Sequence, residues 1–362
     1  MSKNKKILFV SRTLTGGGAE RFVSEMTTYL SNKSMDITLL LYEKSQNDYN
    51  LGSKVKTVLM PERGLGVRNK IFRIVDMKKI IRDINPDIVI PFIDTVVICA
   101  FFATNLHNAK FVYTVRNSPW HEEGTRFSKM MRKVIAYFSS AIMLQNNEQS
   151  EYFPKTYETK EFVVPNPVAR DFVCNLKEAY NRNIYKIISV GRLDSQKNFM
   201  LLLRVMKRLK EEGFEYELQI YGEGSLDKEL TTFINDNELV DKCLLMGRSN
   251  AIADKLKASD LFIMSSNYEG MPNALIEAMA LGVPCISSDC KTGPRSLIIN
   301  KSNGILFETG NENSLFESCK FAFSNPLQMI EMGKKAREDI CSKYTLNNCG
   351  ACFNRMIEEI TK

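Results

Sequence analysis

Residues 261–277, LFIMSSNYEGMPNALIE, join a short apolar run to a segment in which apolar side chains recur at helical spacing. The apolar run predicts a buried strand, and the glycine and proline that follow it predict a turn. Pro272 suits the first turn of a helix, where its missing N–H group would have no partner in any case. A strand that leads directly into a helix is the unit of a parallel α/β sheet, so this stretch decides the predicted fold class.

The same alternation of strand and helix runs along the first half of the chain. Short β-branched or aromatic runs predict strands, and several stretches between them have the apolar spacing of amphipathic helices. The predicted strands are residues 6–10, 37–42, 87–92, 110–115 and 141–144, and the predicted helices are residues 19–30, 67–84 and 127–138. This alternation predicts a parallel sheet with helices on both faces.

A second α/β domain is predicted after the sequence VPNP at residues 164–167, because neither proline can continue a helix or a central strand. Further strands are expected at residues 185–191, 216–221, 243–246, 261–265 and 283–287, with helices at residues 198–212 and 347–360. A length of 362 residues is typical of two domains. We expect doubly wound, Rossmann-like domains at residues 1–165 and 166–345, and a C-terminal helix at residues 346–362 that packs back on the first domain.

Two glutamates stand near the start of the helix predicted in the opening stretch. Glu269 precedes the helix and Glu277 lies on its second turn. Open parallel sheets bind ligands at the carboxyl ends of their strands, and a helix N-terminus offers free N–H groups to phosphate or to sugar hydroxyls. Carboxylates beside such a site suit a sugar nucleotide, because they accept hydrogen bonds from vicinal hydroxyls. The alternative is a capping acid and a surface glutamate.

Two other loops between a strand and a helix carry groups that suit a diphosphate. In the loop GRLDSQKN at residues 191–198, Arg192 and Lys197 could bind one diphosphate and neutralise its charge. In the loop TGGGAER at residues 15–21, Gly17 and Gly18 would let the backbone approach a phosphate at a helix N-terminus. Solvated cations and a flexible turn are the alternatives for these loops.

Together these loops resemble family 4 of the retaining glycosyltransferases, whose two Rossmann-like domains face each other across a cleft in the GT-B fold. The specific motifs are the Glu-x7-Glu pattern of Glu269 and Glu277 and the Gly-Arg-Leu-x3-Lys-Asn loop. The runs GGAER at residues 17–21 and TGPR at residues 292–295 are similar to those of bacterial enzymes that build lipid-linked oligosaccharides and exopolysaccharides. The resemblance covers nearly the whole chain.

The resemblance implies a hexosyltransferase in which the first domain binds the acceptor and the second binds a nucleotide sugar. The donor would be a UDP-sugar, with N-acetylhexosamine or galactose as the sugar, and the acceptor a glycan or a polyprenyl-diphosphate-linked saccharide of bacterial surface polysaccharide or glycan assembly. No cofactor is implied. The implied donor-binding residues are Gly17, Gly18, Arg192, Lys197, Gly247, Arg248, Glu269, Gly270, Met271, Pro272, Asn273 and Glu277.

Carried over to this sequence, Arg192 and Lys197 would hold the diphosphate, Glu277 the ribose, and Glu269 the transferred sugar. Gly247 and Arg248 stand where the family binds the base. Because the sequence contains no Asp-x-Asp motif, we expect no dedicated metal site. We therefore expect a front-face transfer in which the leaving diphosphate accepts the acceptor's proton and the protein stabilises the developing charge.

The sequence departs from the family after the strand predicted at residues 110–115. Many family members carry a histidine at the end of that strand, close to the reacting centre. This chain has Arg116 and Asn117 there, and His121 follows a few residues later. Either His121 or the pair of Arg116 and Asn117 could replace the missing histidine, and a loop histidine without a catalytic role is an equally good interpretation.

The positive charge of the chain is concentrated in its first half. Residues 1–165 hold 24 Lys and Arg against 16 Asp and Glu, whereas the rest of the chain is nearly balanced. Two basic amphipathic segments, residues 63–82 and 126–138, mix these cations with apolar side chains. Such segments suit an anionic membrane surface or a polyprenyl-diphosphate acceptor, and the alternative is a solvated helix face.

Several other classes of protein fit the sequence less well. No apolar run is long enough for a membrane span, and the basic start leads into a strand without a cleavage site, so we expect a cytoplasmic protein, peripheral on the inner membrane if the basic segments bind it. The nine scattered cysteines favour neither disulfides nor a zinc site. A missing GxGxxG motif argues against an NAD enzyme, and the two glutamates argue against a nucleic-acid binder. The alternatives left open are a sugar-nucleotide-binding protein without turnover and an epimerase or phosphorylase of similar fold.

Overall fold

The computed structural model describes residues 5–45, 48–62, 67–92, 94–104, 107–121, 126–173 and 185–362. These residues form two compact units. Unit 1 comprises Met1–Pro167 together with Leu346–Lys362, and unit 2 comprises Val168–Thr345. The chain thus leaves unit 1 at the proline-rich segment and returns to it for its last helix.

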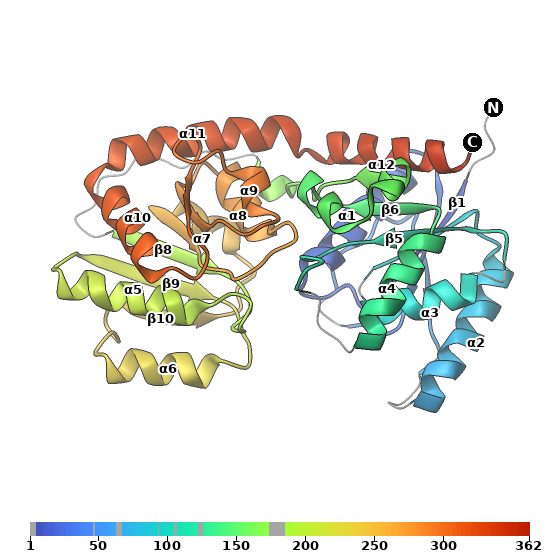
Figure 1. Cartoon of the computed structure of the whole chain (residues 1–362), viewed down its shortest axis with the longest axis horizontal. Coiled ribbons are helices and arrows are strands. Elements are labelled where there is room, and N and C mark those ends of the chain that lie inside the picture. The colour runs from blue at the N-terminus through green and yellow to red at the C-terminus, as the bar shows by residue number, and fades with distance from the viewer. Residues whose placement is uncertain are drawn as a thin grey trace. The chain divides into compact units, whose positions relative to one another are not determined.

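Unit 1 is built on a sheet of seven parallel strands in the order β3-β2-β1-β4-β5-β6-β7 (Figure 1). All of its strand pairs are parallel, and the strand order reverses between β1 and β4. The strands are β1 (Lys6–Ser11), β2 (Asp36–Leu41), β3 (Lys56–Leu59), β4 (Ile88–Pro91), β5 (Lys110–Thr114), β6 (Ala141–Leu144) and β7 (Glu161–Val163).

Helices cover both faces of this sheet, because successive strand side chains point to opposite faces. Ile7 and Phe9 pack with α1 (Gly18–Asn32) and α12 (Leu346–Ile360). Leu8 and Val10 belong to the other core, which contains buried side chains of α2 (Val67–Ile84), α3 (Asp94–Thr104) and α4 (Arg126–Phe138). Short 3₁₀ helices follow β6 and the linker: η1 (Asn147–Tyr152), η2 (Lys155–Lys160) and η3 (Arg170–Phe172).

The C-terminal helix α12 is part of the core of unit 1. The ring of Phe353 stacks on that of Phe9 of β1, with 5.8 Å between the ring centroids. A Cβ atom at Gly350 would overlap the ring of Tyr29 of α1, so a glycine is needed where the two helices approach. The last helix therefore covers the same face of the sheet as α1.

Unit 2 repeats the parallel architecture with six strands in the order β10-β9-β8-β11-β12-β13. The strands are β8 (Tyr185–Val190), β9 (Tyr216–Tyr221), β10 (Cys243–Gly247), β11 (Leu261–Met264), β12 (Cys285–Ser288) and β13 (Ile305–Phe307). The helices are α5 (Phe199–Glu211), α6 (Asp227–Asp236), α7 (Ile252–Lys257), α8 (Asn273–Ala280), α9 (Pro294–Leu297), α10 (Glu312–Ser324) and α11 (Pro326–Lys343).

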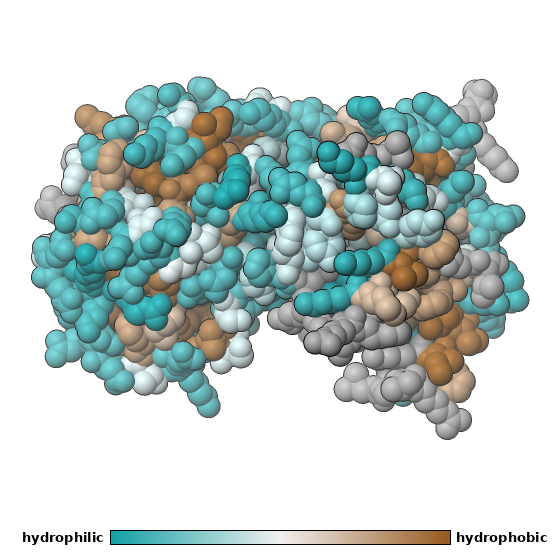
Figure 2. All heavy atoms as spheres, in the orientation of Figure 1, coloured by the Kyte–Doolittle hydropathy of each residue, from teal (hydrophilic) through white to brown (hydrophobic). Residues whose placement is uncertain are grey.

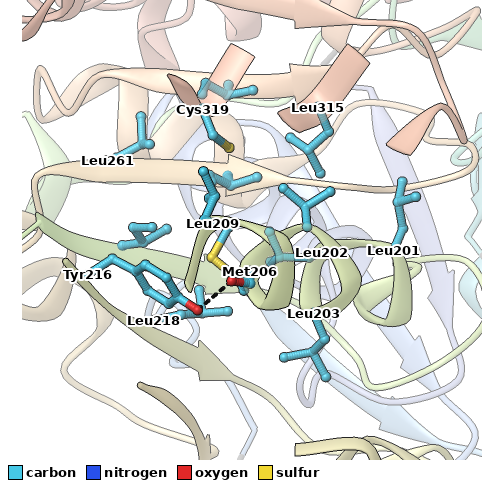
Figure 3. Close-up of a cluster of buried hydrophobic side chains, with 14 of the residues drawn as sticks. Leu201, Leu202, Leu203, Met206, Leu209, Tyr216, Leu218, Leu261, Leu315 and Cys319 are labelled. Atoms are coloured by element: carbon cyan, nitrogen blue, oxygen red, sulfur yellow. Dashed lines mark hydrogen bonds between the residues drawn. The ribbon is translucent and has the colours of Figure 1, made fainter. Parts of the chain in front are cut away.

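The core of unit 2 lies on both faces of its sheet. On one face, leucines of α5 pack against strand side chains such as Leu218, and the buried Tyr216 hydroxyl donates a 2.6 Å hydrogen bond to the Met206 carbonyl oxygen (Figure 3). On the other face lie the apolar side chains of α7, α8 and α9. The strand order reverses between β8 and β11, which makes the carboxyl ends of these two neighbours the expected ligand-binding position.

The predicted α/β fold class is confirmed, and most predicted elements lie within one or two residues of the observed ones. No stated prediction corresponds to the strands β3, β7 and β13 or to several of the helices, among them α3, α10 and α11. None of the helices in the described ranges combines the length and the apolar character that crossing a bilayer requires.

Candidate functional site

Two loops of unit 2 lie side by side where the strand order reverses. One follows β8 and the other follows β11. The Asn267 backbone N–H donates to the Gln196 carbonyl oxygen at 2.8 Å, and the Asn267 side chain donates to the Ser195 carbonyl oxygen at 2.8 Å. Ser265 donates its hydroxyl hydrogen to the Lys197 carbonyl oxygen at 2.9 Å. These hydrogen bonds fix to each other two loops that are far apart in the chain: Asn267 and Ser195 are separated by 72 positions.

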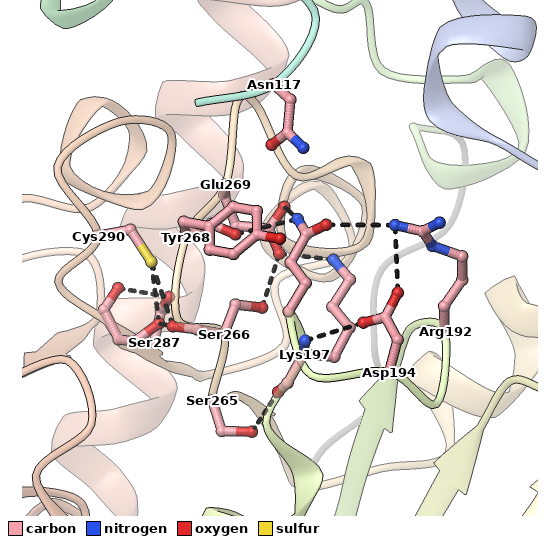
Figure 4. A network of polar contacts seen from close by, with 12 residues as sticks. Asn117, Arg192, Asp194, Lys197, Ser265, Ser266, Tyr268, Glu269, Ser287 and Cys290 are labelled. Atoms are coloured by element: carbon pink, nitrogen blue, oxygen red, sulfur yellow. Dashed lines mark hydrogen bonds and ion pairs between the residues drawn. The ribbon is translucent and has the colours of Figure 1, made fainter. Parts of the chain in front are cut away.

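The centre of these loops is an ion pair between Lys197 and Glu269 (Figure 4). The distance from Lys197 Nζ to Glu269 Oε1 is 2.5 Å, and the two side chains are only 15% and 6% exposed. The Ser266 hydroxyl donates to the same carboxylate oxygen at 2.6 Å, and Gln196 Nε2 donates to Oε2 at 3.4 Å. Both oxygens of Glu269 therefore accept hydrogen bonds, which fixes the plane of a buried carboxylate.

Arg192 stands at the open side of the same network. Its side chain is 71% exposed, and Nη2 lies 3.2 Å from both Asp194 Oδ2 and Gln196 Oε1. Asp194 Oδ1 accepts a 3.2 Å hydrogen bond from the Lys197 backbone N–H. The loop after β8 thus supplies one largely buried cation, Lys197, and one exposed cation, Arg192, which Asp194 and Gln196 hold in place.

Gln196 is a member of this site that the sequence did not indicate. Its side chain is buried, donates to the Tyr268 carbonyl oxygen at 3.0 Å, and accepts from Arg192. It therefore connects the exposed arginine to the buried glutamate. A glutamine in a polar loop carries no distinctive spacing, so its position inside the GRLDSQKN motif was the only available signal.

Helix α8 begins directly after the loop that carries Glu269. Pro272 is the N-cap residue, with φ −77° and ψ 110°, and so precedes the first turn that the sequence predicted for it. No side chain caps this helix end. Glu277 is buried on the second turn of the helix. The N-terminal N–H groups of α8 are thus presented beside two buried carboxylates.

The TGPR segment, residues 292–295, packs against the loop that carries Glu269 and Gly270. Thr292 donates its hydroxyl hydrogen to the Glu269 carbonyl oxygen. Gly293 has φ +85°, and a Cβ atom there would lie 2.8 Å from the Gly270 carbonyl oxygen. Only glycine combines this left-handed backbone with so close an approach, so the motif shapes the loop around Gly270.

A third loop, after β9, completes the strand-end surface of unit 2. The Gly222 backbone N–H donates to the Gly247 carbonyl oxygen at 2.9 Å, at the end of β10. A Cβ atom at Gly222 would overlap the Gly191 carbonyl oxygen. The loops after β8, β9 and β10 are therefore in contact, and Arg248 lies exposed at the end of β10.

In unit 1, Arg116 follows β5 and points into the protein. Its guanidinium lies 4.1 Å from the Phe22 ring centroid, and Nη2 donates to Asn166 Oδ1 at 2.8 Å. Nε and Nη1 are inaccessible and have no hydrogen-bond partner in the structure. Burial lowers the pKa of the Arg116 guanidinium, and the charge of Glu20 opposes this shift.

Neighbouring amides hold the same segment of unit 1. Asn166 Oδ1 also accepts from Gln145 Nε2 at 3.2 Å, and Gln149 Nε2 donates to the Asn117 carbonyl oxygen at 3.0 Å. His121 is exposed, and its Nδ1 lies 3.1 Å from the Ser118 hydroxyl oxygen. The structure therefore puts Arg116 in a buried network and His121 at the surface.

The glycine loop of unit 1 ends at the start of α1. Gly17 is the N-cap residue of this helix and has no side-chain cap. The Glu20 carboxylate folds back over Gly17, where a Cβ atom would overlap it. Gly18 begins the helix, so both predicted glycines lie at a helix N-terminus.

No group of three His, Cys, Asp or Glu side chains in the described ranges is arranged to hold a metal ion. What the structure does provide is a strand-end site with a buried lysine–glutamate pair, an exposed arginine and an uncapped helix N-terminus. Doubly wound sheets bind ligands at the carboxyl ends of their strands near the point of strand reversal, and a helix N-terminus beside cations suits a phosphorylated ligand.

Two family models match this chain. "Glycosyl transferases group 1" matches residues 177–339, and "Glycosyl transferase 4-like" matches residues 6–146. An uncharacterized glycosyltransferase of Methanocaldococcus jannaschii is 34% identical over 330 residues, which cover 78% of this chain and 79% of that protein. The chain belongs to the family 4 glycosyltransferases, as the resemblance of its motifs predicted.

Two other similar proteins have informative names. The UDP-Gal:alpha-D-GlcNAc-diphosphoundecaprenol alpha-1,3-galactosyltransferase of Escherichia coli is 26% identical, over 91% of this chain and 90% of that protein. The HepE protein of Anabaena, crystallised with UDP and glucose, has a TM-score of 0.82 at 14% identity, over 98% of this chain and 99% of that one. The latter similarity shows the GT-B fold alone.

Proposed function

We propose that this glycosyltransferase transfers a hexose from a UDP-sugar to a lipid-linked or glycan acceptor with retention of configuration and without a metal ion. The sugar is galactose or an N-acetylhexosamine. Unit 2 binds the donor and unit 1 the acceptor, in the assembly of a bacterial surface polysaccharide or glycan. The protein works on the cytoplasmic side, in peripheral contact with an anionic membrane.

The observation that carries this proposal is the Lys197–Glu269 pair beside the start of α8. Glu269 is held in one orientation by Lys197 and Ser266, as hydroxyl recognition on a sugar requires. The Lys197 ammonium has three N–H donors and can bind Glu269 and a phosphate oxygen together. We assign Arg192 and Lys197 to the diphosphate, Glu269 to the sugar, Glu277 to the ribose, and Gly247 with Arg248 to the base.

The proposed reaction proceeds on one face of the sugar. The bond between the anomeric carbon and the diphosphate oxygen breaks, and a bond from that carbon to an acceptor hydroxyl oxygen forms. The hydroxyl proton passes to the departing diphosphate oxygen. Arg192, Lys197 and the N–H groups from Gly270 to Asn273 stabilise the charge that develops on the diphosphate.

Glu269 is poorly suited to act as a nucleophile in this reaction. Its two oxygens already accept hydrogen bonds from Lys197, Ser266 and Gln196, and a buried ion pair lowers the reactivity of a carboxylate. This supports the front-face pathway. Gly17 and Gly18 are proposed to close on the diphosphate, and Arg116 or His121 to bind near the reacting centre.

The names of similar proteins support the substrates. The Escherichia coli relative uses UDP-Gal and a diphosphoundecaprenol-linked acceptor by name, and HepE holds UDP and glucose. A diphosphate-linked lipid acceptor also fits the basic composition of the first half of the chain.

A thermal-shift screen with UDP, GDP, ADP and NAD in chelator tests the donor assignment. Ligand at 100 times its Kd adds about 2.7 kcal/mol to the free energy of unfolding, which raises the Tm by several degrees. We expect a shift with UDP that is lost in Glu277→Ala. A shift with NAD alone would contradict the proposal. So would the absence of a shift with any of the nucleoside diphosphates.

Transfer and its stereochemistry need a second measurement. Incubation with UDP-galactose or UDP-N-acetylhexosamines and a water-soluble diphosphate acceptor should give a product whose anomeric proton shows retention by NMR. Binding of UDP without any transfer or hydrolysis would favour the alternative, a sugar-nucleotide-binding protein without turnover.

A further inference from the structure

One outer surface of unit 1 combines exposed apolar side chains with positive charge. Helices α2, α3 and α4 pack on the same face of the sheet. Seven of the thirteen exposed large apolar side chains in the described residues belong to these helices, so exposed apolar surface is concentrated there. They are Ile71, Phe72, Val75, Phe102, Met130, Tyr137 and Phe138, which we call the outer apolar patch.

Figure 2 shows hydrophobic atoms gathered over the part of unit 1 where Figure 1 draws α4 and the neighbouring α2. Phe138 is 64% exposed and Ile71 is 59% exposed, too much for side chains that merely border a core. A monomeric protein rarely exposes such a group without a binding partner for it.

The charge of these helices distinguishes them from the rest of the chain. By sequence, α2, α3 and α4 hold ten Lys and Arg against three Asp. Their excess of seven positive charges equals the net charge of +7 of the whole chain. On α2, Lys78 and Arg82 continue the helical face that begins with Ile71 and Val75, and on α4 Lys133 lies between Met130 and Tyr137.

The opposite face of the same sheet provides an internal comparison. Helices α1 and α12 each contain one arginine and two glutamates, and they carry no exposed large apolar side chain in the described residues. The basic, apolar character therefore belongs to one face of unit 1 and is not a property of its helices in general.

We propose that the outer face of α2, α3 and α4 docks on an anionic lipid bilayer. The apolar side chains of the patch enter the interface, and lysines such as Lys78, Lys79 and Lys133, all exposed, bind the phosphates of the lipid headgroups. Tyr137 suits the boundary between lipid and water. Its ring packs on the ring of Tyr157, and the Lys160 ammonium lies over it, so aromatic and cationic groups lie together there.

A bilayer fits this surface better than a nucleic acid does. Four of the seven side chains of the outer apolar patch have rings on which a base could stack, but Ile71, Val75 and Met130 are aliphatic and contact only an apolar partner well. Docking by this surface would bring a membrane-held acceptor to unit 1. Its role in supplying the acceptor rests on the proposed function, whereas the docking itself does not.

Cosedimentation with vesicles tests the docking surface directly. The full chain should bind phosphatidylglycerol-containing vesicles, more weakly at high salt, and bind phosphatidylcholine vesicles far less. The variant Lys78→Glu/Lys79→Glu/Lys133→Glu should lose about 100-fold in partitioning, because each basic residue contributes roughly fivefold. Ile71→Ser/Phe138→Ser should lose about tenfold through its apolar contribution.

Matched variants on unit 2 serve as controls. Lys228→Glu/Lys255→Glu/Lys335→Glu changes the net charge equally at exposed positions, and Val240→Ser/Leu327→Ser removes two exposed apolar side chains. Both should bind vesicles within about twofold of the parent. An equal loss in these controls would overturn the proposal. So would equal binding to both lipids, preferential binding of single-stranded RNA, or a dimer that only the patch variants disrupt.

Insertion can be measured separately from attraction. The sequence contains one tryptophan, Trp120, so Trp120→Phe/Phe138→Trp places a single fluorophore on the patch. Brominated acyl chains should quench it in anionic vesicles, and absence of quenching in bound protein would contradict insertion. Transfer to a water-soluble acceptor without lipid should be unchanged in the docking variants. Failure of that reaction in the parent chain would instead refute the proposed function.

Discussion

Each unit of this protein buries a cation after a strand near its point of strand reversal, but the two cations have different surroundings. In unit 2, Lys197 pairs with the Glu269 carboxylate at 2.5 Å. In unit 1, Arg116 hydrogen-bonds to the neutral amide of Asn166 and lies against Phe22, and two of its nitrogens, Nε and Nη1, have no hydrogen-bond partner. The same architecture therefore supports one cation that is hydrogen-bonded to a carboxylate and one that is hydrogen-bonded to a neutral amide, with the charge of Glu20 acting on it.

The difference indicates how each unit holds its loops. Unit 2 fixes two loops to each other through a buried ion pair. Removing either partner alone strongly destabilises the fold, because the other charge is left buried without a partner. Unit 1 also fixes the segment after β5 through the amides of Gln145, Gln149 and Asn166, so we expect it to tolerate loss of its cation better than unit 2 does. The predictions below test this contrast.

The largest effect is expected for Lys197→Met. It should lower the free energy of unfolding by about 3–5 kcal/mol, because Glu269 is left charged and buried. It should also lower transfer by about 100-fold or more, through loss of charge stabilisation on the diphosphate. Chemical denaturation and initial rates measure the two effects.

Arg192→Ala and a double variant are the controls for Lys197. Arg192 is mostly exposed, so its removal should reduce transfer strongly while leaving stability within about 0.5 kcal/mol. Lys197→Met/Glu269→Leu should be more stable than Lys197→Met alone. If Lys197→Met unfolds no more easily than Arg192→Ala, the ion pair is not what holds the loops.

The next effect concerns the close approach of the loops after β8 and β9. Gly222→Ala should destabilise by more than about 2 kcal/mol, because its Cβ atom would overlap the Gly191 carbonyl oxygen. Gly213 has φ +79°, but no atom lies within 4 Å of the position of an added Cβ atom. Gly213→Ala should therefore cost only about 1 kcal/mol. Similar melting temperatures for both variants would mean that the loop contact adds no rigidity.

A smaller effect is expected in unit 1. Arg116→Met should change the free energy of unfolding by no more than about 1–2 kcal/mol, in either direction, because removing a buried, incompletely paired cation also removes its desolvation cost. A loss as large as that of Lys197→Met would erase the contrast between the units. Arg116→Lys serves as the charge-conserving control.

The smallest change is expected in the reactivity of a thiol behind the ion pair. Burial raises the pKa of Cys290 to about 12, and its Sγ lies 3.3 Å from the Ser266 carbonyl oxygen. Site-resolved maleimide labelling at neutral pH should therefore leave Cys290 unmodified while the exposed Cys352 reacts. Faster labelling of Cys290 in Lys197→Met would show that the loops have loosened, and rapid labelling in the parent would show that they were never fixed.

The elements that the sequence missed had weak local patterns. Helix α3, DTVVICAFFAT, is apolar on nearly all sides, and so it lacks the polar face by which a surface helix is recognised. Strands β7 and β13 have three residues each, too few for a periodic pattern. The long, amphipathic α2 was predicted with its observed bounds, because it has one buried and one solvated face.

The site was predicted as a set of residues but not as an arrangement. Lys197 and Glu269 were expected to bind different parts of one ligand, and the structure pairs them with each other. Gln196 and Ser266 were not expected at all, although both hold the Glu269 carboxylate. A sequence gives no sign of hydrogen bonds between residues more than 70 positions apart, such as Gln196 and Glu269 at a separation of 73.

The sequence alone determined the fold class, the family and the loops that carry the candidate site, because strand-to-helix transitions, glycines and prolines are local signals. Only the tertiary structure decided which loops meet, because the order of strands in a sheet follows from long-range pairing. By making β8 and β11 neighbours, that pairing turned two distant motifs into one site. It also gathered the cations of α2 and α4 on one face of unit 1, where the sequence showed only two separate basic segments.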